Sequence, residues 1–288
     1  MNRLENYKIH LDKTLLGGQI FSFDKCSDGY WGVVGNTVIH LTQQDEELYW
    51  QTYPEQDNYQ LIGEFLRVDV DYNQVIQQIS VDQHIEQAIK SYPNLRLLKG
   101  DLNQTILSFI LSSNSNIAKI RNSTRLLSEE FGDKVNVGKR VFYTFPPVER
   151  IANASIESLA QTKIGYRAEY LKRASQQILE NNTFELVQKY AEKKKEIEVR
   201  EALLNLHGVG EKVADCIMSY SLNFDNVTAL DVWGKRFCSR FYGFENPKYA
   251  EIRSSLQLYF NGYTAWAGQF LFEYVRENWD KLQLDGDK

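Results

Sequence analysis

Apolar and aromatic residues in the first part of the chain cluster in short runs between turn signals. Phe21 and Phe23 form one run and residues 30–39 hold another, between the turn residues of 27–29 and 35–36. Short runs rich in aromatic and β-branched residues, bounded by Gly, Asn, Asp and Ser, are typical of strands. The pattern therefore predicts that residues 1–75 are mostly β, as an antiparallel sheet.

Beyond this region the apolar positions change to a helical spacing. Residues 74–92 have the apolar pattern of helical structure, which breaks at Pro93 and Asn94, and from Leu102 onward the pattern predicts helices to the end of the chain. The first of these, Leu102–Leu111, is apolar enough to be buried. We therefore expect an α+β fold, with an N-terminal antiparallel sheet plus helix domain over 1–95 and a two-part helical domain over 96–288.

A hairpin in the helical region has a composition suited to anion binding. The sequence predicts a helix end at Ala202–Leu206, a turn at His207-Gly208-Val209-Gly210 and a second helix over Glu211–Tyr220. Two glycines separated by one residue permit a tight turn with positive φ. The free N–H groups at the start of the next helix, together with the helix dipole, suit a phosphate.

Two ionisable residues follow this hairpin. Lys212 lies in the first turn of the second helix, and a lysine that loses its proton can act as a nucleophile and form a Schiff base. Asp231 precedes a third helical pattern, where an N-cap would fix its carboxylate, and the intervening loop could bring it opposite Lys212. Taken singly, each feature has an ordinary structural explanation as a turn, a solvated lysine or a helix cap.

Taken together, LHGVGEKVADC and Asp231 resemble the helix-hairpin-helix Gly/Pro–Asp DNA glycosylase superfamily. In that family the lysine after the hairpin is the nucleophile and the aspartate nineteen residues on is its partner, which matches Lys212 and Asp231. The segments LDKTLLGGQIFSF and YWGVVGNTVIHLTQ resemble the N-terminal domain of 8-oxoguanine DNA glycosylases. The resemblance runs from Leu11 to about Trp279 and places the helix-hairpin-helix at about 197–222. It implies a bifunctional 8-oxoguanine DNA glycosylase and apurinic-site lyase that acts on double-stranded DNA.

The resemblance also implies a pocket for the oxidised base. Gly18 would offer its carbonyl to the hydrogen on N7, which guanine lacks, so that one acceptor discriminates the two bases. Phe272 would stack on the base, with Cys216 on the opposite face. The family's pocket glutamine aligns with Gly268, so either Gln269 compensates through a local shift or water and backbone read the Watson–Crick edge.

A second set of residues is implied to hold the DNA open. Asn114 would fill the space left by the extruded nucleotide, Tyr166 would wedge into the stack, and Arg167 would hydrogen-bond the estranged cytosine. Lys119 stands where the family has an arginine. Because lysine offers one point charge instead of a planar fork, we expect looser selection of the base opposite the lesion.

The hairpin region supplies the remaining implied contacts. Phosphates would be held by the amides of Gly208, Gly210 and Val213 and by Trp233, whose indole N–H replaces a histidine common in relatives. Relatives can hold a metal ion on hairpin carbonyls, which match Leu204, Leu206 and Val209 here. Three carbonyls make a hard-ion site with loose selectivity, and no cofactor is required for the chemistry.

Charge is distributed unevenly along the 288 residues. The net charge of −5 disfavours a nucleic-acid partner, but residues 1–95 carry 6 Lys and Arg against 14 Asp and Glu, whereas residues 96–288 carry 27 against 24. A DNA surface is therefore expected on the later part of the chain. The sequence has no run of about eighteen apolar residues, no apolar signal core in residues 1–13 and three widely spaced cysteines. We expect a cytoplasmic monomer without a membrane span.

Three alternatives remain open. The first is another glycosylase of the same superfamily, which fits poorly. Iron–sulfur members need four clustered cysteines after the aspartate, where this chain has Cys238 alone, and monofunctional alkyl-base members lack the lysine found at position 212. A non-catalytic helix-hairpin-helix DNA-binding module predicts that Lys212 is dispensable. A globular domain without a DNA role agrees with the pI of about 5.5 but leaves the joint spacing unexplained.

Overall fold

Five antiparallel strands near the N-terminus form one sheet, in the order β1-β5-β4-β3-β2. The computed structural model describes residues 1–245 and 248–284. The strands are β1 (Asn2–Leu4), β2 (Phe23–Cys26), β3 (Gly29–Val34), β4 (Thr37–Gln44) and β5 (Glu47–Tyr53). Between β3 and β4, Gly35 has a φ of 55°, a conformation that suits glycine in a short hairpin turn. The predicted antiparallel sheet is confirmed, but the prediction that residues 1–75 are mostly β is wrong beyond Tyr53. Residues 59–66 form a helix there, because Asn58 accepts the Leu61 amide hydrogen at 3.0 Å and so caps a helix start.

Two short helices cover one face of this sheet. These are α1 (Leu11–Leu16) and α2 (Tyr59–Leu66), and their apolar residues share a core with the strands. Phe23 of the sheet stacks on Phe65 of α2, with ring centroids 5.6 Å apart. Because α1 is held by this core, the glycines that follow it are carried to the edge of the sheet domain that faces the helical part.

The helical character predicted for residues 74–92 is confirmed. The structure has two helices, α3 (Tyr72–Ile79) and α4 (Gln83–Ser91), and the chain turns between them. Asp82 caps α4 by accepting the amide hydrogens of His84 and Ile85, at 2.7 and 3.1 Å. An aspartate side chain that binds the first amides of a helix favours a new helix start over continuation of the previous one. Both helices pack on helices from the end of the chain, described below.

A first helical group contains the predicted hairpin. It comprises α5 (Leu102–Ile110), α6 (Ile117–Phe131), α7 (Val148–Asn153), α8 (Ile156–Leu159), the π-turn η1 (Ala160–Ile164), α9 (Arg167–Glu180), α10 (Thr183–Glu192), α11 (Glu196–Leu204) and α12 (Glu211–Ser221). Helix α5 is buried at every position except Asn103, as its apolar sequence predicts. The second helix of the hairpin also begins at the predicted Glu211.

A two-stranded hairpin interrupts these helices, so the prediction of helix from Leu102 to the end of the chain is wrong. Strands β6 (Lys134–Val137) and β7 (Arg140–Tyr143) pair around Gly138, whose φ is 58°. The ring of Phe142 stacks on Trp31 of the sheet at 5.5 Å, and the Arg140 guanidinium lies 4.5 Å from the same indole. These contacts fix the hairpin against the sheet and join the two parts of the molecule.

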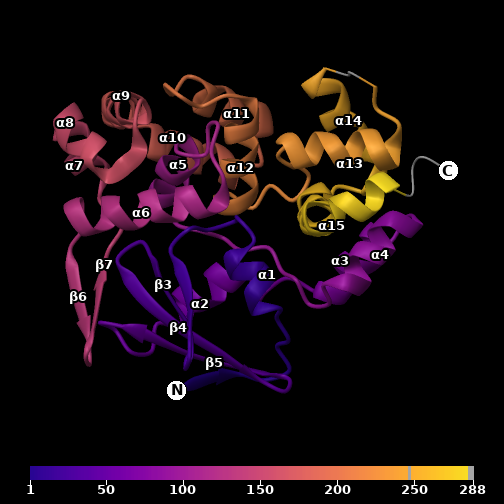
Figure 1. Cartoon of the computed structure of the whole chain (residues 1–288), viewed down its shortest axis with the longest axis horizontal. Coiled ribbons are helices and arrows are strands. Elements are labelled where there is room, and N and C mark those ends of the chain that lie inside the picture. The colour runs from indigo at the N-terminus through magenta and orange to yellow at the C-terminus, as the bar shows by residue number, and fades with distance from the viewer. Residues whose placement is uncertain (246–247, 285–288) are drawn as a thin grey trace.

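A second helical group closes the molecule. It contains α13 (Val232–Tyr242), α14 (Tyr249–Tyr259) and α15 (Thr264–Leu284), and it shares its core with α3 and α4. Figure 1 shows the sheet at the bottom, α5 to α12 above it, and α13 to α15 with α3 and α4 to the right. The α+β fold with a two-part helical region is confirmed. Within residues 1–245 and 248–284, no helix is both long enough and apolar enough to cross a bilayer.

Candidate active site

A cavity of about 1030 Å³ opens where the sheet domain and the two helical groups meet. Its wall includes most of the residues singled out from the sequence: Gly18, Asn114, Gly208, Gly210, Lys212, Val213, Cys216, Asp231, Trp233, Gln269 and Phe272. Lys119, Tyr166, Arg167, Leu204, Leu206 and Val209 lie outside this wall. Residues that are far apart in sequence therefore face one space large enough for a nucleotide.

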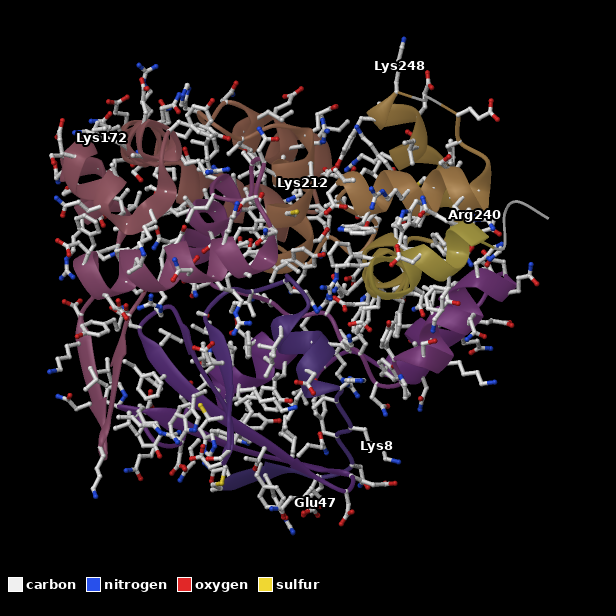
Figure 2. All side chains as sticks on the ribbon, viewed as in Figure 1. Lys8, Glu47, Lys172, Lys212, Arg240 and Lys248 are labelled. Atoms are coloured by element: carbon white, nitrogen blue, oxygen red, sulfur yellow. The ribbon has the colours of Figure 1, made fainter. Side chains whose placement is uncertain are left out.

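Lys212 projects into this cavity from the first turn of α12. Its Nζ donates a hydrogen bond to Ser112 Oγ, 3.0 Å away, and lies 5.3 Å from the ring centroid of Phe109. Figure 2 shows Lys212 in the middle of the molecule, whereas Lys8 and Lys172 lie at its periphery. The Ser112 hydroxyl and the Phe109 ring hold the side chain in place, and neither of them is an anion.

Asp231 lies at the start of α13. Its Oδ1 accepts the amide hydrogen of Gly234 at 2.8 Å, so the predicted N-cap is confirmed. A Cβ at Gly234 would lie 3.0 Å from the carbonyl oxygen of Ala229, which shows how tightly the chain turns into this helix. The cap fixes the carboxylate in orientation while leaving it on the wall of the cavity that Lys212 also lines.

The apolar part of the wall comes from Cys216 and Phe272. Cys216 lies one turn after Lys212 on α12 and is 2% exposed. Burial raises the pKa of its thiol to about 12, with Lys212 opposing this effect and Asp231 adding to it. The sulfur is therefore protonated at neutral pH and offers a packing surface instead of a reactive thiolate. Phe272 lines the same cavity and has the Arg276 guanidinium 5.5 Å from its ring.

Gly18 and Gln269 are connected through Gly17. The backbone of Gly18 has a φ of 90°, and a Cβ there would lie 3.1 Å from the Ile117 side chain. The amide of Gln269 accepts from the Tyr220 hydroxyl at 2.8 Å and donates to the Gly17 carbonyl at 3.3 Å. With only 2% of its surface exposed and both ends of its amide bonded, Gln269 holds the glycine loop in place.

The expected gap-holding residues meet at the loop that follows α5. Arg167 donates from Nε to the Ser113 carbonyl at 2.8 Å and from Nη2 to the Asn114 carbonyl at 3.0 Å. The ring of Tyr166 is 51% exposed, and its hydroxyl lies 3.4 Å from the Ser113 carbonyl. Lys119 is exposed in the first turn of α6. The structure thus brings Asn114, Tyr166 and Arg167 together at the edge of the cavity.

The hairpin between α11 and α12 has amides available to an anion. The amides of Gly208, Gly210 and Val213 make no hydrogen bond to the described residues, whereas Val209 donates to the Leu206 carbonyl at 3.1 Å. Gly208 has a φ of 82°, and a Cβ there would lie 3.1 Å from the Tyr170 ring, so a glycine is needed for this turn. Unpaired amides before a helix are suited to a phosphate group.

Trp233 lines the same cavity as the hairpin residues Gly208, Gly210 and Val213. The Arg236 guanidinium lies 4.4 Å from the ring of Trp233 and 4.8 Å from that of Trp279. A cation held over two aromatic faces adds positive charge next to Trp233.

Sequence reasoning missed several residues around this cavity. Ser112 lies in a Ser/Asn run that composition marks only as a loop, although its hydroxyl accepts from Lys212. Tyr249 donates to Asp215 Oδ2 at 2.7 Å, and its oxygen accepts from the Leu230 amide at 3.3 Å. No spacing in the sequence connects these positions, since they meet only through tertiary packing.

Burial raises the pKa of the Asp215 carboxyl, and two arginines oppose that effect. Arg253 Nε lies 3.4 Å and Arg200 Nε 3.2 Å from its oxygens. Through Tyr249 this buried carboxyl is connected to the chain immediately before Asp231, so α12 and the start of α13 are held in one network.

The fold and the cavity together define a helix-hairpin-helix protein whose largest described features are a hairpin with unpaired amides and a cavity lined by a lysine and an aspartate. Residues 107–261 match the HhH-GPD superfamily base excision DNA repair protein family, and residues 2–106 match the family 8-oxoguanine DNA glycosylase, N-terminal domain. The chain therefore belongs to the HhH-GPD superfamily of base excision DNA repair proteins, and it carries the N-terminal domain of 8-oxoguanine DNA glycosylases in front of it.

Individual relatives agree with this assignment. The chain is 29% identical over 189 residues to the N-glycosylase/DNA lyase of Saccharomyces cerevisiae, a match that covers 62% of this chain and 50% of that protein. It thus spans about half the length of this relative. The 8-oxoguanine glycosylase/lyase of Clostridium acetobutylicum, solved with double-stranded DNA containing cytosine opposite 8-oxoguanine, superimposes with a TM-score of 0.86 and 27% identity over 96% of this chain and 93% of that one. MBOgg1, solved with a low affinity DNA ligand, gives a TM-score of 0.87 and 29% identity over 93% and 92%.

Proposed function

We propose that this protein is a bifunctional DNA repair glycosylase that excises 8-oxoguanine from duplex DNA and then cleaves the strand by β-elimination. One observation carries the proposal: a single cavity is lined by Lys212, Asp231, Gly18, Cys216 and Phe272. An amine and a carboxylate on one wall suit chemistry at a sugar carbon, and the remaining residues suit a flat oxidised purine. The activities named for the yeast and Clostridium relatives support the same assignment.

DNA binding begins at the phosphates. The free amides of Gly208, Gly210 and Val213 receive phosphate oxygens, and Trp233 donates its indole N–H beside them. Binding is therefore salt-dependent, since counterions leave the DNA as it docks. The damaged nucleotide turns out of the duplex into the cavity, and Asn114, Tyr166 and Arg167 fill the gap it leaves.

Base selection takes place between Cys216 and Phe272. The oxidised purine stacks between the neutral thiol and the phenyl ring, and the Gly18 carbonyl accepts the hydrogen on its N7. Undamaged guanine has a lone pair at N7, which would face the carbonyl lone pair without a hydrogen bond. The hydrogen bond from Gln269 to Gly17 holds this loop at a fixed distance from the base.

The chemistry uses the amine of Lys212 as the nucleophile. In its neutral form this amine attacks C1′ while the bond to the base breaks, and the base leaves with the bonding electrons and takes up a proton. The Asp231 carboxylate stabilises the positive charge that develops on the sugar, and Ser112 orients the amine beforehand. Opening of the sugar gives a Schiff base on Lys212, which acidifies the 2′ hydrogen. Loss of that proton expels the 3′ phosphate and cuts the strand.

A cofactor is not needed for any of these steps. A hard cation is a candidate ligand of the carbonyls of Leu204, Leu206 and Val209 at the end of α11. The Leu206 carbonyl accepts from the Val209 amide at 3.1 Å and retains a second lone pair, so these carbonyls fit such an ion without being required to bind it. The three cysteines are free thiols, which agrees with a monomer working in a reducing compartment such as the cytoplasm.

Borohydride trapping tests the proposal. The protein is mixed with duplex DNA that contains one 8-oxoguanine, and borohydride reduces the Schiff base to a stable protein–DNA adduct. We expect an adduct with the native chain and with Lys172→Gln, a matched change at the periphery, but none with Lys212→Gln (Figure 2). An adduct that survives Lys212→Gln would move the nucleophile elsewhere. No adduct with the native chain would favour a non-catalytic DNA-binding module.

The same assay defines the damaged base. We expect strand cleavage at 8-oxoguanine and none at guanine in the same sequence context. Cleavage at another oxidised or alkylated base, with 8-oxoguanine left intact, would show that the protein is a glycosylase for a different lesion. The position of the cut, on the 3′ side of the lesion, distinguishes β-elimination from hydrolysis of an abasic site.

A further inference from the structure

The hydroxyl of Thr228 lies against α15 at Gly268, a position that has no side chain, on the wall of the cavity. A Cβ built at Gly268 would lie 2.0 Å from Thr228 Oγ1 and 3.0 Å from Thr228 Cβ. Both residues line the cavity. Because 2.0 Å is far inside van der Waals contact, the Thr228 side chain occupies the space that any side chain at position 268 would need. Glycine at 268 is therefore what allows Thr228 to lie against this face of the helix.

This hydroxyl lies next to the ring that is expected to stack on the base. Gly268 and Phe272 are four residues apart in α15, so they lie on one face of the helix in adjacent turns. Such neighbours are about 5–6 Å apart along a helix. A purine stacked on Phe272 directs its polar edges sideways, along the wall on which Thr228 lies.

The neighbouring polar side chains already have partners. Gln269 is bonded to Tyr220 and Gly17, and the Tyr249 hydroxyl is bonded to Asp215 and to the Leu230 amide. Within residues 1–245 and 248–284, the Thr228 hydroxyl makes no side-chain hydrogen bond, although the residue is only 7% exposed. Because Thr228 lines the cavity, its hydroxyl is available to a ligand bound there.

We propose that the Thr228 hydroxyl hydrogen-bonds the Watson–Crick edge of the extruded purine and is a specificity-determining residue of the pocket. The inference rests on the function proposed above and names how that same site reads its substrate. A hydroxyl both donates and accepts, so it can accept from N1–H or the 2-amino group of 8-oxoguanine, or donate to O6. Gly268 and Thr228 act as a pair: Gly268 has no side chain, and the Thr228 hydroxyl occupies the space that a side chain at position 268 would need.

Two substitutions separate the hydroxyl from its shape. Thr228→Val keeps the branched side chain and removes the hydroxyl, whereas Thr228→Ser keeps the hydroxyl. Thr124→Val is the matched control, because Thr124 is 1% exposed in α6, outside the cavity wall, and its hydroxyl also lacks a partner. Two single-turnover rates are measured for each variant, release of 8-oxoguanine and cleavage of DNA with a preformed abasic site.

We expect Thr228→Val to slow 8-oxoguanine release about tenfold, the effect of about 1.4 kcal/mol on a barrier. It should leave cleavage at the abasic site unchanged, because that DNA has no base to contact. Thr228→Ser and Thr124→Val should retain the native rate of release.

An unchanged release rate in Thr228→Val would overturn the inference, and so would an equal loss in both reactions, which would show a role in folding or in the chemistry. If Thr228→Val does not fold, comparison of Thr228→Ser with Thr228→Ala gives the same decision. Native protein that fails to release 8-oxoguanine would instead contradict the proposed function, and this inference with it.

Discussion

Gln269 Nε2 donates to the carbonyl oxygen of Gly17, 3.3 Å away, and so fixes the glycine loop of the sheet domain to α15. The same amide accepts from Tyr220 on α12 at 2.8 Å. One side chain thus connects three segments that surround the base pocket. From the sequence alone, Gln269 is a candidate to read the base because it follows Gly268. Its contacts with Gly17 and Tyr220 indicate instead that it positions Gly18.

Replacing Gln269 with leucine should weaken discrimination between 8-oxoguanine and guanine. Leucine has a similar volume but cannot bond to Gly17 or Tyr220, so the Gly18 carbonyl is no longer held against N7. We expect the ratio of kcat/KM for the two bases to fall about tenfold, with a loss of about 1–3 kcal/mol in the free energy of unfolding. Competition between the two duplexes measures the ratio.

Gln104→Leu controls for the loss of stability. Gln104 is also buried, and it bonds to the Gly35 amide and the Val33 carbonyl, both at 3.1 Å, away from the cavity wall. This variant should lose comparable stability and keep its selectivity. Equal loss of selectivity in both variants would contradict a positioning role for Gln269.

Tyr249→Phe should slow the chemistry by disturbing the chain before Asp231. The substitution removes the bond to Asp215 and the acceptor for the Leu230 amide. We expect a drop of about tenfold in the rate of borohydride trapping with little change in DNA affinity, and a loss of about 1–3 kcal/mol in stability. Tyr242→Phe, which removes a 3.2 Å bond to Asp82, is the matched control and should keep the native trapping rate.

The stability of the protein should depend on pH through Glu273. This carboxyl is fully buried in α15, and burial raises its pKa although Arg276 and Lys13 oppose the effect. A group with a raised pKa in the folded state contributes stability that is fully present below its unfolded pKa, about 4.3, and is lost as the pH rises through the folded value.

Glu273→Gln cannot titrate, so the native chain should gain stability relative to this variant as the pH falls from 8 to 5. Urea unfolding of both chains at the two pH values measures the difference. A difference that stays constant, or one that shrinks on acidification, would show that the buried carboxyl is held charged by its cationic neighbours.

Lys119 should permit cleavage opposite several bases. Its side chain is exposed in the first turn of α6 and carries one ammonium group, which cannot bind a base edge with two parallel bonds. We expect excision rates opposite C, A, G and T to lie within about tenfold of each other, and Lys119→Arg to increase the preference for C. A strict preference for C in the native chain would count against this prediction.

The helix-hairpin-helix was predictable because its signals are local. The two glycines, the start of α12 and the cap at Asp231 each depend on neighbours within a few residues, and each lies where the sequence predicts. The hairpin of β6 and β7 was missed although VNVGKRVFY contains alternating apolar residues around a glycine turn. Four-residue strands give a weak periodic signal, and these two are stabilised by Trp31, which lies far away in the sequence.

The site was predictable only in part, for the same physical reason. Lys212 and Asp231 belong to a motif with fixed spacing, but Thr228, Tyr249 and Ser112 reach the cavity through tertiary packing. Thr228 lies in the segment between α12 and α13, and its role depends on its contact with Gly268 of α15. A contact between residues so far apart in the sequence leaves no pattern in one sequence.

Helices α3 and α4 follow the sheet in sequence but share their core with α13 to α15. Val75, Ile79 and Ile85 lie in that core with Phe270, as does Leu97 just beyond α4. A fragment that begins after residue 95 would lack α3 and α4, so the aliphatic and aromatic side chains of α13 to α15 that pack on them would be exposed to water. Residues 1–95 and the rest of the chain thus share one hydrophobic core. We expect neither part to fold when it is expressed as a separate fragment.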